Sequence, residues 1–299
     1  MTIKTEIPQE GKRRGHRKTW LVVGIVLLLL AVYFLAPVQT NILLLGIDRT
    51  PQGTELGRSD TMILAGIQPL QPKVTLLSIP RDLWLTIPGY GENRINTAHY
   101  FAELKEPGTG PAAAAHAVEV NFHVTVPYYL RIDIDTLSQL VDTMGGITID
   151  LSQPAGGLPA GTHTLDGYQA QAFVRNRAGS DDFFRMQHGQ LFLRAVLHQI
   201  LQPGTWPKIP ELINIFAHGT TTNVPVWLWP RLALALVRAG PGGINAQIID
   251  RSMVTPTTTS GGASVLLPDW QKIDPFVQGL FPPAPYVFRI FSANAGSAG

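Results

Sequence analysis

Residues 41–82 read NILLLGIDRTPQGTELGRSDTMILAGIQPLQPKVTLLSIPRD, and they contain three apolar segments with charged residues at their ends. The segments are 41–47, 61–67 and 74–80. Apolar runs of this length, bounded by Gly and Pro, are typical of strands that are buried on both faces of a sheet. Polar side chains then gather where the strands end. This stretch therefore predicts three central strands whose charged ends lie at one edge of a sheet.

The charged residues at these strand ends include two carboxylates, Asp48 and Asp60, and two guanidiniums, Arg58 and Arg81. Arg58 and Asp60 are two positions apart, so they point to the same face of an extended chain. Open α/β sheets bind ligands at such edges, but structural ion pairs also cluster there. The spacing alone leaves both interpretations open.

The N-terminal residues divide into a basic tail and an apolar run. Residues 1–18 carry six Lys or Arg and two Glu, a net charge of +4, and residues 20–36 read WLVVGIVLLLLAVYFLA. An apolar run of this length after positive charge is typical of a membrane helix with a cytoplasmic N-terminus. A cleaved signal peptide is the alternative, which Pro37 disfavours. We expect a cytoplasmic tail over 1–18, a transmembrane helix over 19–37 and an exported domain beyond it.

Composition constrains the exported part. The whole chain carries a net charge of +2, so residues 19–299 carry −2. A duplex-binding surface is normally a basic patch, and we therefore expect no nucleic-acid partner. The chain has no Cys, which excludes disulfides and thiolate metal sites. We expect one domain over 38–290 and a disordered tail over 291–299.

Helix-like and strand-like segments alternate after residue 82. Strand patterns cover 125–134 and 147–151, and helix patterns start near residues 96, 111, 135 and 166. Asp135 is the expected N-cap of one helix and Gly145 its end, while Arg131 is expected on the solvent face of a strand. Such alternation predicts an α/β sandwich with a mixed central sheet flanked by helices.

A second concentration of charge follows the helix over 166–174. Arg175 and Arg177 are two apart and would point the same way in an extended chain, and Asp182 and Arg185 open a long helix. The planar guanidinium is well suited to holding phosphate. This segment therefore predicts an anion site beside the sheet.

Seven short motifs occur in the order seen in the LytR-CpsA-Psr family, which this chain resembles over about residues 41–202. Together they are much more specific than any one of them, and the N-terminal anchor also looks like that family. The motifs are Gly-Ile-Asp (46–48), Arg-Ser-Asp-Thr (58–61), Ser-Ile-Pro-Arg-Asp (78–82), Arg-Ile-Asn-x-Ala (94–98), Met-Gly-Gly-Ile (144–147), Leu-Asp-Gly (165–167) and Val-Arg-Asn-Arg (174–177).

The resemblance implies a single-pass phosphotransferase of the plasma membrane with an extracytoplasmic catalytic domain. Such proteins move a glycopolymer from a polyprenyl-pyrophosphate carrier to peptidoglycan or another envelope acceptor, and they hold the lipid tail in an apolar tunnel. The implied cofactor is Mg²⁺, with Mn²⁺ as the alternative. Phosphoryl transfer requires mainly positioning and charge neutralisation, which a carboxylate-held Mg²⁺ and several arginines supply.

The resemblance also implies a role for each matching residue. Asp48 and Asp60 would be linked to the metal. The implied catalytic residues are Asp48, Arg81, Arg175 and Arg177. The implied pyrophosphate-binding residues are Arg58, Arg81, Arg94, Arg175, Arg177, Asp182 and Arg185.

The long helix departs from the family pattern Asp-x-x-Arg-x-x-Arg-Gln. Asp182 and Arg185 fit, but His188 and Gly189 stand where Arg and Gln are usual, and Gln190 comes one position later. One helical position is about 100°, so Gln190 is not expected to replace the missing Gln. We expect His188 on the solvated surface of the helix rather than at the phosphate.

Other functions remain open at this point. A noncatalytic module that binds polyprenyl glycolipids, or a polyprenyl-pyrophosphate hydrolase, would use the same residues. A membrane-tethered DNA-binding regulator is disfavoured by the outward topology and the net charge of −2. The eight His form no HExxH motif, so zinc hydrolysis is not expected.

Overall fold

The computed structural model describes residues 14–35, 39–47, 57, 59–68, 73–176 and 182–282. The chain forms two compact units, Met1–Pro37 and Val38–Gly299. The expected disordered tail over 291–299 lies outside the described residues.

The first unit contains helix α1 (Arg14–Leu35). Its large apolar side chains from Trp20 to Val32 are exposed. The side chains of this helix are described for residues 19–34, and within the described part of the chain no helix reaches both the length and the apolarity of a membrane span.

The second unit is built on a six-stranded sheet in the order β10-β3-β2-β1-β6-β9. The strands are β1 (Thr40–Ile47), β2 (Ser59–Gln68), β3 (Lys73–Ser78), β6 (Tyr128–Asp133), β9 (Thr220–Thr222) and β10 (Ile244–Ile248). Neighbours β1–β2, β2–β3 and β6–β9 are antiparallel, whereas β1–β6 and β10–β3 are parallel. The predicted mixed sheet is confirmed, and the three strands predicted from residues 41–82 lie side by side at its centre.

Alternate residues of these central strands enter two different cores, as expected for strands that are covered on both sides. Leu43, Leu45 and Leu64 belong to one core, while Ile42 and Ile63 belong to the other. All five side chains are at most 5% exposed. The sheet is therefore sandwiched, and only its ends are open to polar chemistry.

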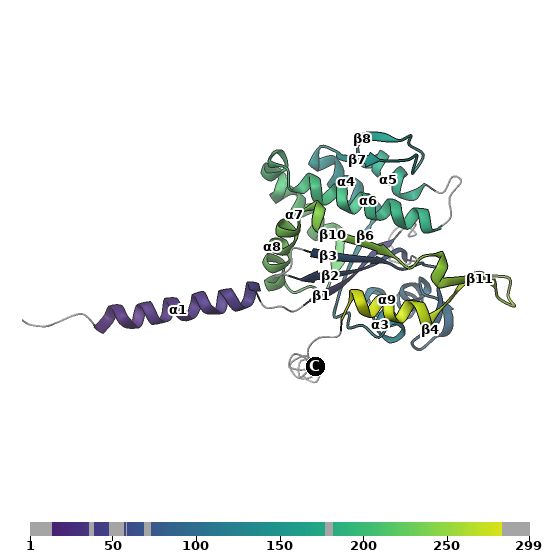
Figure 1. Ribbon diagram of the computed structural model, residues 1–299, viewed down its shortest axis with the longest axis horizontal. Helices are drawn as coiled ribbons and strands as arrows, with labels where there is room; N and C mark the ends of the chain where they lie inside the picture. The colour runs from purple at the N-terminus through teal and green to yellow at the C-terminus, as the bar shows by residue number, and fades with distance from the viewer. Residues whose placement is uncertain are drawn as a thin grey trace, which may run out of the picture. The chain divides into compact units, whose positions relative to one another are not determined.

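Helices cover both faces of the sheet (Figure 1). Helices α3 (Gly110–Phe122) and α9 (Trp270–Leu280) pack on the first core, and α6 (Asp182–Ile200) and α8 (Trp229–Ala239) pack on the second. An outer layer packs against α6 through a third core. Its elements are α4 (Ile134–Met144), α5 (Gly167–Arg175), α7 (Ile209–Gly219), β7 (Ile147–Leu151) and β8 (Gly161–Leu165).

Short elements fill the connections. They are α2 (Thr97–Lys105), the hairpins β4 (Trp84–Ile87)–β5 (Gly91–Arg94) and β11 (Val254–Thr258)–β12 (Ser264–Pro268), and the 3₁₀ helices η1 (Pro203–Lys208), η2 (Val226–Leu228), η3 (Pro241–Gly243) and η4 (Arg251–Met253).

Two expectations about β6 and α4 are wrong. The N-cap of α4 is Asp133, whose carboxylate accepts the N–H of Thr136 at 2.7 Å, and not Asp135. Arg131 is only 8% exposed, so it does not lie on a solvent face. The first error arises because β6 ends at Asp133 and passes directly into α4 at Ile134. Arg131 pairs with Leu45 of the first core, so it lies on a face of the sheet that helices cover. Gly145 ends α4 with φ 89°, a conformation that suits glycine.

Candidate functional site

The strand ends meet at one edge of the sheet because β1, β2 and β3 form an antiparallel meander. Asp60 is the second residue of β2, and Arg81 follows the end of β3 at Ser78. The antiparallel pairing places the start of β2 beside the end of β3, and the Arg81 guanidinium forms an ion pair with Asp60. Two residues that are distant in sequence thus become neighbours, as the strand pattern predicts.

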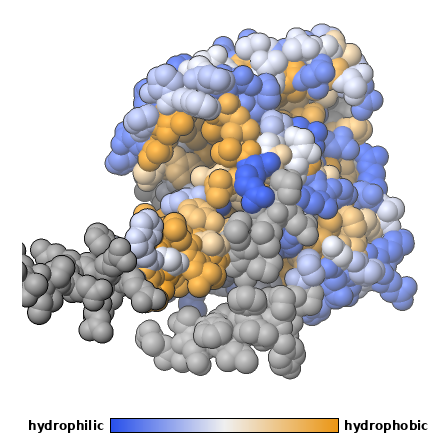
Figure 2. Space-filling model, turned by 60° about the vertical axis from the view of Figure 1, so that its left-hand side comes forward, coloured by the Kyte–Doolittle hydropathy of each residue, from blue (hydrophilic) through white to orange (hydrophobic). Residues whose placement is uncertain are grey.

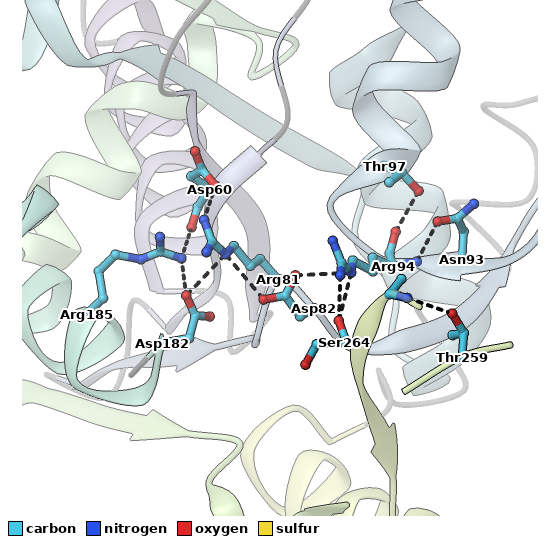
Figure 3. Close-up of polar contacts among 11 residues, drawn as sticks. Asp60, Arg81, Asp82, Asn93, Arg94, Thr97, Asp182, Arg185, Thr259 and Ser264 are labelled. Carbon is cyan, nitrogen blue, oxygen red and sulfur yellow. Dashed lines mark hydrogen bonds and ion pairs between the residues drawn. The ribbon is translucent and has the colours of Figure 1, made fainter. Parts of the chain in front are cut away.

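Arg81 is the centre of a cluster of ion pairs (Figure 3). Besides Asp60, its Nε lies 3.2 Å from Asp182 Oδ1 and 3.5 Å from Asp82 Oδ2. Asp182 begins α6 and also pairs with Arg185, one turn further along the same helix. The Arg185 guanidinium in addition donates to the backbone carbonyl of Asp60 at 3.0 Å. The cluster therefore joins β2, the segment after β3, and the first turn of α6.

Burial gives these groups unusual electrostatics. Burial by itself lowers the pKa of Arg81, but Asp182 and Asp60 outweigh it and the pKa of Arg81 is raised. Burial raises the pKa of Asp182 above its ordinary value, and the nearby Arg185 and Arg81 offset this only in part. Arg81 is thus firmly charged, whereas burial disfavours the ionised form of Asp182 more than its two arginine partners favour it.

A second part of the network continues from Asp82 (Figure 3). Asp82 Oδ1 lies 3.4 Å from the Nε of Arg94, at the end of β5. The Arg94 guanidinium donates to the backbone carbonyl of Ser264 at 2.6 and 3.1 Å. Arg94 is predicted as a phosphate ligand, and in the structure its guanidinium binds the β11–β12 hairpin through the Ser264 carbonyl.

Sequence reasoning assigned no role to Asp82 or Ser264. Asp82 is visible in the sequence as a charge at a strand end. The contribution of Ser264 is a backbone carbonyl, and a carbonyl has no sequence signature.

The structure describes only one of the four remaining predicted site residues. Asp48, Arg58 and Arg177 lie outside the described residues. Arg175 is in the last turn of α5 and is half-buried. It is therefore helical, and the expectation of an extended chain at Arg175 is wrong because the helix that begins at the Asp166 capping box continues one residue further than expected.

The described part of the cluster is balanced in charge. Three arginines (Arg81, Arg94 and Arg185) face three carboxylates (Asp60, Asp82 and Asp182). An oxyanion that binds to these three guanidiniums competes with the carboxylates for them. Among the described residues, no group of three His, Cys, Asp or Glu could hold a metal ion.

Helix α6 departs from expectation at His188. The His188 side chain is 5% exposed and its ring centroid lies 5.0 Å from that of Phe173, so a position on the solvated surface is wrong. Burial lowers the pKa of His188. The cause is the outer layer, in which α5 and the β7–β8 connection cover the side of α6 that faces away from the sheet.

The two residues after His188 differ from each other in their contacts. A β-carbon at Gly189 would have no heavy atom within 4 Å, so packing does not require glycine at this position. Gln190 points to the sheet, where its amide donates to Ser78 Oγ at 2.9 Å and to the Gln247 carbonyl at 2.6 Å. Gln190 therefore ties α6 to β3 and β10.

Hollows lie on both sides of α6. A small cavity of about 10 Å³ lies behind the ion pairs and is lined by Asp60, Ser78, Asp182 and Arg185 among others. A hollow of about 620 Å³ lies on the opposite side, between α6 and residues 150–159, and His188 is part of its lining.

An apolar depression is visible on one side of the second unit. Figure 2 brings forward the side of the molecule that carries α7 and α8 and shows hydrophobic residues gathered around a depression. Leu44, Tyr128 and Leu130 on the sheet are only partly buried, although they pack against the core beneath α6 and α8. Central strands normally lose such exposure when helices cover them tightly, so this face is incompletely filled.

Comparisons with known proteins agree on one family. A sequence model of the LytR_cpsA_psr family matches residues 35–277. The polyisoprenyl-teichoic acid–peptidoglycan teichoic acid transferase TagU of Oceanobacillus iheyensis is 35% identical over 190 residues, which are 62% of this chain and 58% of the relative. The probable cell wall biosynthesis protein LcpB of Corynebacterium glutamicum is 30% identical over 219 residues, 68% of this chain and 50% of the relative.

A solved structure shares the fold. The crystal structure of B. subtilis TagV has a TM-score of 0.66 at 21% identity, and the match covers 83% of this chain and 99% of that chain. The two curated relatives are matched over only 50–58% of their own length.

Proposed function

This chain belongs to the LytR-CpsA-Psr family, which matches it over residues 35–277, and we propose that it transfers a glycopolymer from a polyprenyl diphosphate carrier to an envelope acceptor. The observation that carries the proposal is the ion-pair cluster, in which Arg81 and Arg185 converge on Asp182 at the edge of the sheet. The name of the 35% identical relative, a transferase from polyisoprenyl-linked teichoic acid to peptidoglycan, supports it.

In the proposed reaction, an acceptor hydroxyl attacks the phosphorus atom that carries the glycan. A P–O bond to the acceptor forms as the bond to the bridging oxygen breaks, and polyprenyl phosphate leaves with the electron pair. The proton of the hydroxyl passes to a carboxylate, for which Asp48 is our candidate. Arg81 and Arg185 stabilise charge on the phosphate oxygens, and Asp182 positions both guanidiniums.

Carboxylate oxygens, the ligand type that a divalent cation prefers, are present at this edge of the sheet. Asp60 presents a carboxylate at the edge of the sheet, and Asp182 Oδ2 is buried without a hydrogen-bond partner within the described part of the chain. Mg²⁺ is commonly held by one or two carboxylates together with substrate phosphates. We propose that Asp60, with Asp48, holds Mg²⁺, or Mn²⁺ in its place, which would neutralise diphosphate charge. Arg81 would then exchange Asp60 for phosphate oxygens.

The apolar depression is our candidate for the lipid tail. Leu44, Tyr128 and Leu130 leave space on the sheet face beneath α6 and α8. The small cavity at Asp60 also borders Ile63, which belongs to the same apolar core. A tail in the depression would therefore end close to the ion-pair cluster.

We propose a single-pass location in the plasma membrane with the second unit outside the cytoplasm. The basic flank of residues 1–18 and the exposed apolar side chains of α1 support this topology. An extracytoplasmic position would give the site access to peptidoglycan.

The test is transfer by the purified full chain. The donor is a synthetic polyprenyl diphosphate that carries a radiolabelled disaccharide, and the acceptor is a soluble peptidoglycan fragment, with Mg²⁺ or with a chelator. We expect label on the acceptor, release of polyprenyl phosphate, and loss of both with the chelator. Arg81→Ala should lower kcat by about 10²-fold, because one stabilising donor is lost.

Each outcome separates the candidate functions. Label released as a sugar phosphate in water, without transfer, would identify a hydrolase. Saturable binding of the donor without turnover would identify a binding module. Unchanged turnover in Arg81→Ala would contradict the assignment of the site.

A further inference from the structure

The outer faces of η1, α7, η2 and α8 are unusually apolar. Val226 is 84% exposed, Trp227 60%, Ile213 62% and Trp206 58%, and Leu234 and Val237 are also exposed. We call these six residues the edge surface. Large apolar side chains that are exposed together mark interaction sites rather than ordinary surface.

The pattern of α8 shows that this exposure is not a by-product of core packing. Leu232 and Ala235 face the core and are buried, yet Leu234 and Val237 on the other side of the helix are exposed. A surface helix normally carries polar residues opposite its buried stripe. The outer side of α8 instead combines exposed apolar side chains with the exposed Arg238, a mixture that suits an amphipathic binding surface.

The parts of the edge surface belong to adjoining elements. The rings of Phe216 on α7 and Trp229 on α8 are 5.5 Å apart and nearly perpendicular. In Figure 1, α7 and α8 lie on the same side of the second unit, and Figure 2 shows hydrophobic residues around the depression there.

The charge of this segment favours an anionic partner. Residues 203–243 contain three cations, Lys208, Arg231 and Arg238, against one anion, Glu211. This surplus of +2 stands within residues 19–299, whose net charge is −2. Tryptophan is enriched at the interface between lipid and water, and basic residues near an anionic bilayer each contribute about 1 kcal/mol.

The position of the edge surface agrees with a bilayer as the partner. Elements η2 and α8 pack on Ile42, Ile67 and Val74, which are at the start of β1, the end of β2 and the start of β3. The strand that follows the apolar N-terminal segment in the chain therefore begins at this same edge. The ion-pair cluster is at the opposite edge, about 25 Å away along β2.

We propose that the edge surface docks the second unit on an anionic lipid bilayer. A docked edge surface would also open the apolar depression towards the bilayer, so that a lipid tail could enter without crossing water. That consequence rests on the proposed function, whereas the docking itself rests on exposure, charge and position.

The absence of Cys from the chain allows a direct test with the full chain. A single cysteine is introduced as Val226→Cys, or as Tyr168→Cys on α5, which is 77% exposed and serves as the matched control. Each variant is labelled with an environment-sensitive NBD probe. It is then reconstituted in vesicles of equal parts phosphatidylcholine and phosphatidylglycerol, with and without brominated acyl chains.

We expect blue-shifted emission at position 226 and quenching by brominated lipid about twofold or more stronger than at position 168, because interfacial side chains reach the acyl boundary. The difference should shrink in vesicles of phosphatidylcholine alone. If the protein floats with the vesicles but quenching is equal at both positions, docking is overturned and the membrane anchor is still supported. A blue shift without quenching indicates a protein partner, such as a second copy, and also overturns it.

Two further results keep this inference separate from the proposed function. Failure of the full chain to float with vesicles would overturn both the anchor and docking. A chain that shows the expected quenching but no transferase activity would support docking while the proposed function fails.

Discussion

Arg81 is the residue through which the candidate site is connected. It faces three carboxylates that come from β2, from its own segment and from α6. Each carboxylate opposes the burial that would lower the pKa of Arg81. Removal of this one side chain would remove its ion pair with Asp60, while Asp182 would keep Arg185 and Asp82 would keep Arg94. Arg81→Ala therefore tests the loss of one guanidinium at the proposed phosphate site.

His188 provides a residue-scale prediction about pH. Its pKa is lowered by burial from the ordinary 6.5, so below about pH 6.5 the unfolded chain binds a proton that the folded chain resists. The stability that His188 contributes is therefore present above pH 6.5 and is lost as the pH falls below it. We expect His188→Gln to show a smaller decrease in the free energy of unfolding than the wild type between about pH 8 and about pH 5.5.

The measurement is urea unfolding at several pH values. His116→Gln is the control, because the His116 side chain is 59% exposed. If the free energy of unfolding changed equally with pH in His188→Gln and the wild type, the buried, neutral state of His188 would be contradicted.

At the scale of elements, α6 is the helix on which the site depends. It supplies Asp182 and Arg185 to the cluster, contributes to the apolar core beneath α8, and supports the outer layer. Its orientation relative to the sheet is set near the middle by Gln190, whose amide bridges Ser78 on β3 and the Gln247 carbonyl on β10. The position of Asp182 beside Arg81 therefore depends on a contact two turns away.

We expect Gln190→Leu to reduce the free energy of unfolding by about 1–3 kcal/mol, because the buried Ser78 hydroxyl and the partly buried Gln247 carbonyl lose their donor. Gln187→Leu, at an exposed position of the same helix, should change it by less than about 0.5 kcal/mol. Urea unfolding measures both. Equal effects of the two substitutions would show that the contact of Gln190 with the sheet does not stabilise α6.

At the scale of the whole molecule, the sheet separates two kinds of chemistry. The ion pairs lie at one edge, where β2 starts, and the edge surface lies where β2 ends. On the face of the sheet between them, Leu44 and Leu130 are only partly buried. The proposed substrate, a lipid with a charged head, combines the same two kinds of chemistry.

This arrangement predicts a dependence on tail length. Leu130→Trp should fill part of the depression and raise the KM for a long-chain donor by about tenfold, the cost of about two unburied CH₂ groups. A short-chain donor should be unaffected, because its tail does not reach the filled space. Steady-state kinetics with both donors measures the difference, and Leu104→Trp, at an exposed position on α2, is the control.

A result of equal KM changes for both donors would place the tail elsewhere. Thermal unfolding of Leu130→Trp should accompany the kinetics, because overpacking of a filled core costs about 1–3 kcal/mol. A large loss of stability would show that the space beside Leu130 is occupied in the native protein.

The sequence alone determined the central strands, because alternation between two apolar faces is a local property of residues 41–82. It also determined the family, since the ordered motifs are visible without coordinates. The strand pattern predicted that Asp60 and Arg81 meet at one edge of the sheet. The interpretation of His188 and Arg131 as surface residues was wrong, because burial depends on which layer packs over a helix or a strand end.

Only the tertiary structure decided which groups touch. The clamp of Arg94 on the Ser264 carbonyl joins positions 170 residues apart and involves a backbone atom, so no pattern of side chains could predict it. The balance of three arginines against three carboxylates also arises only when β2, the segment after β3 and α6 converge. Local patterns specify what each segment is, whereas partners are specified by long-range packing, which depends on the whole chain at once.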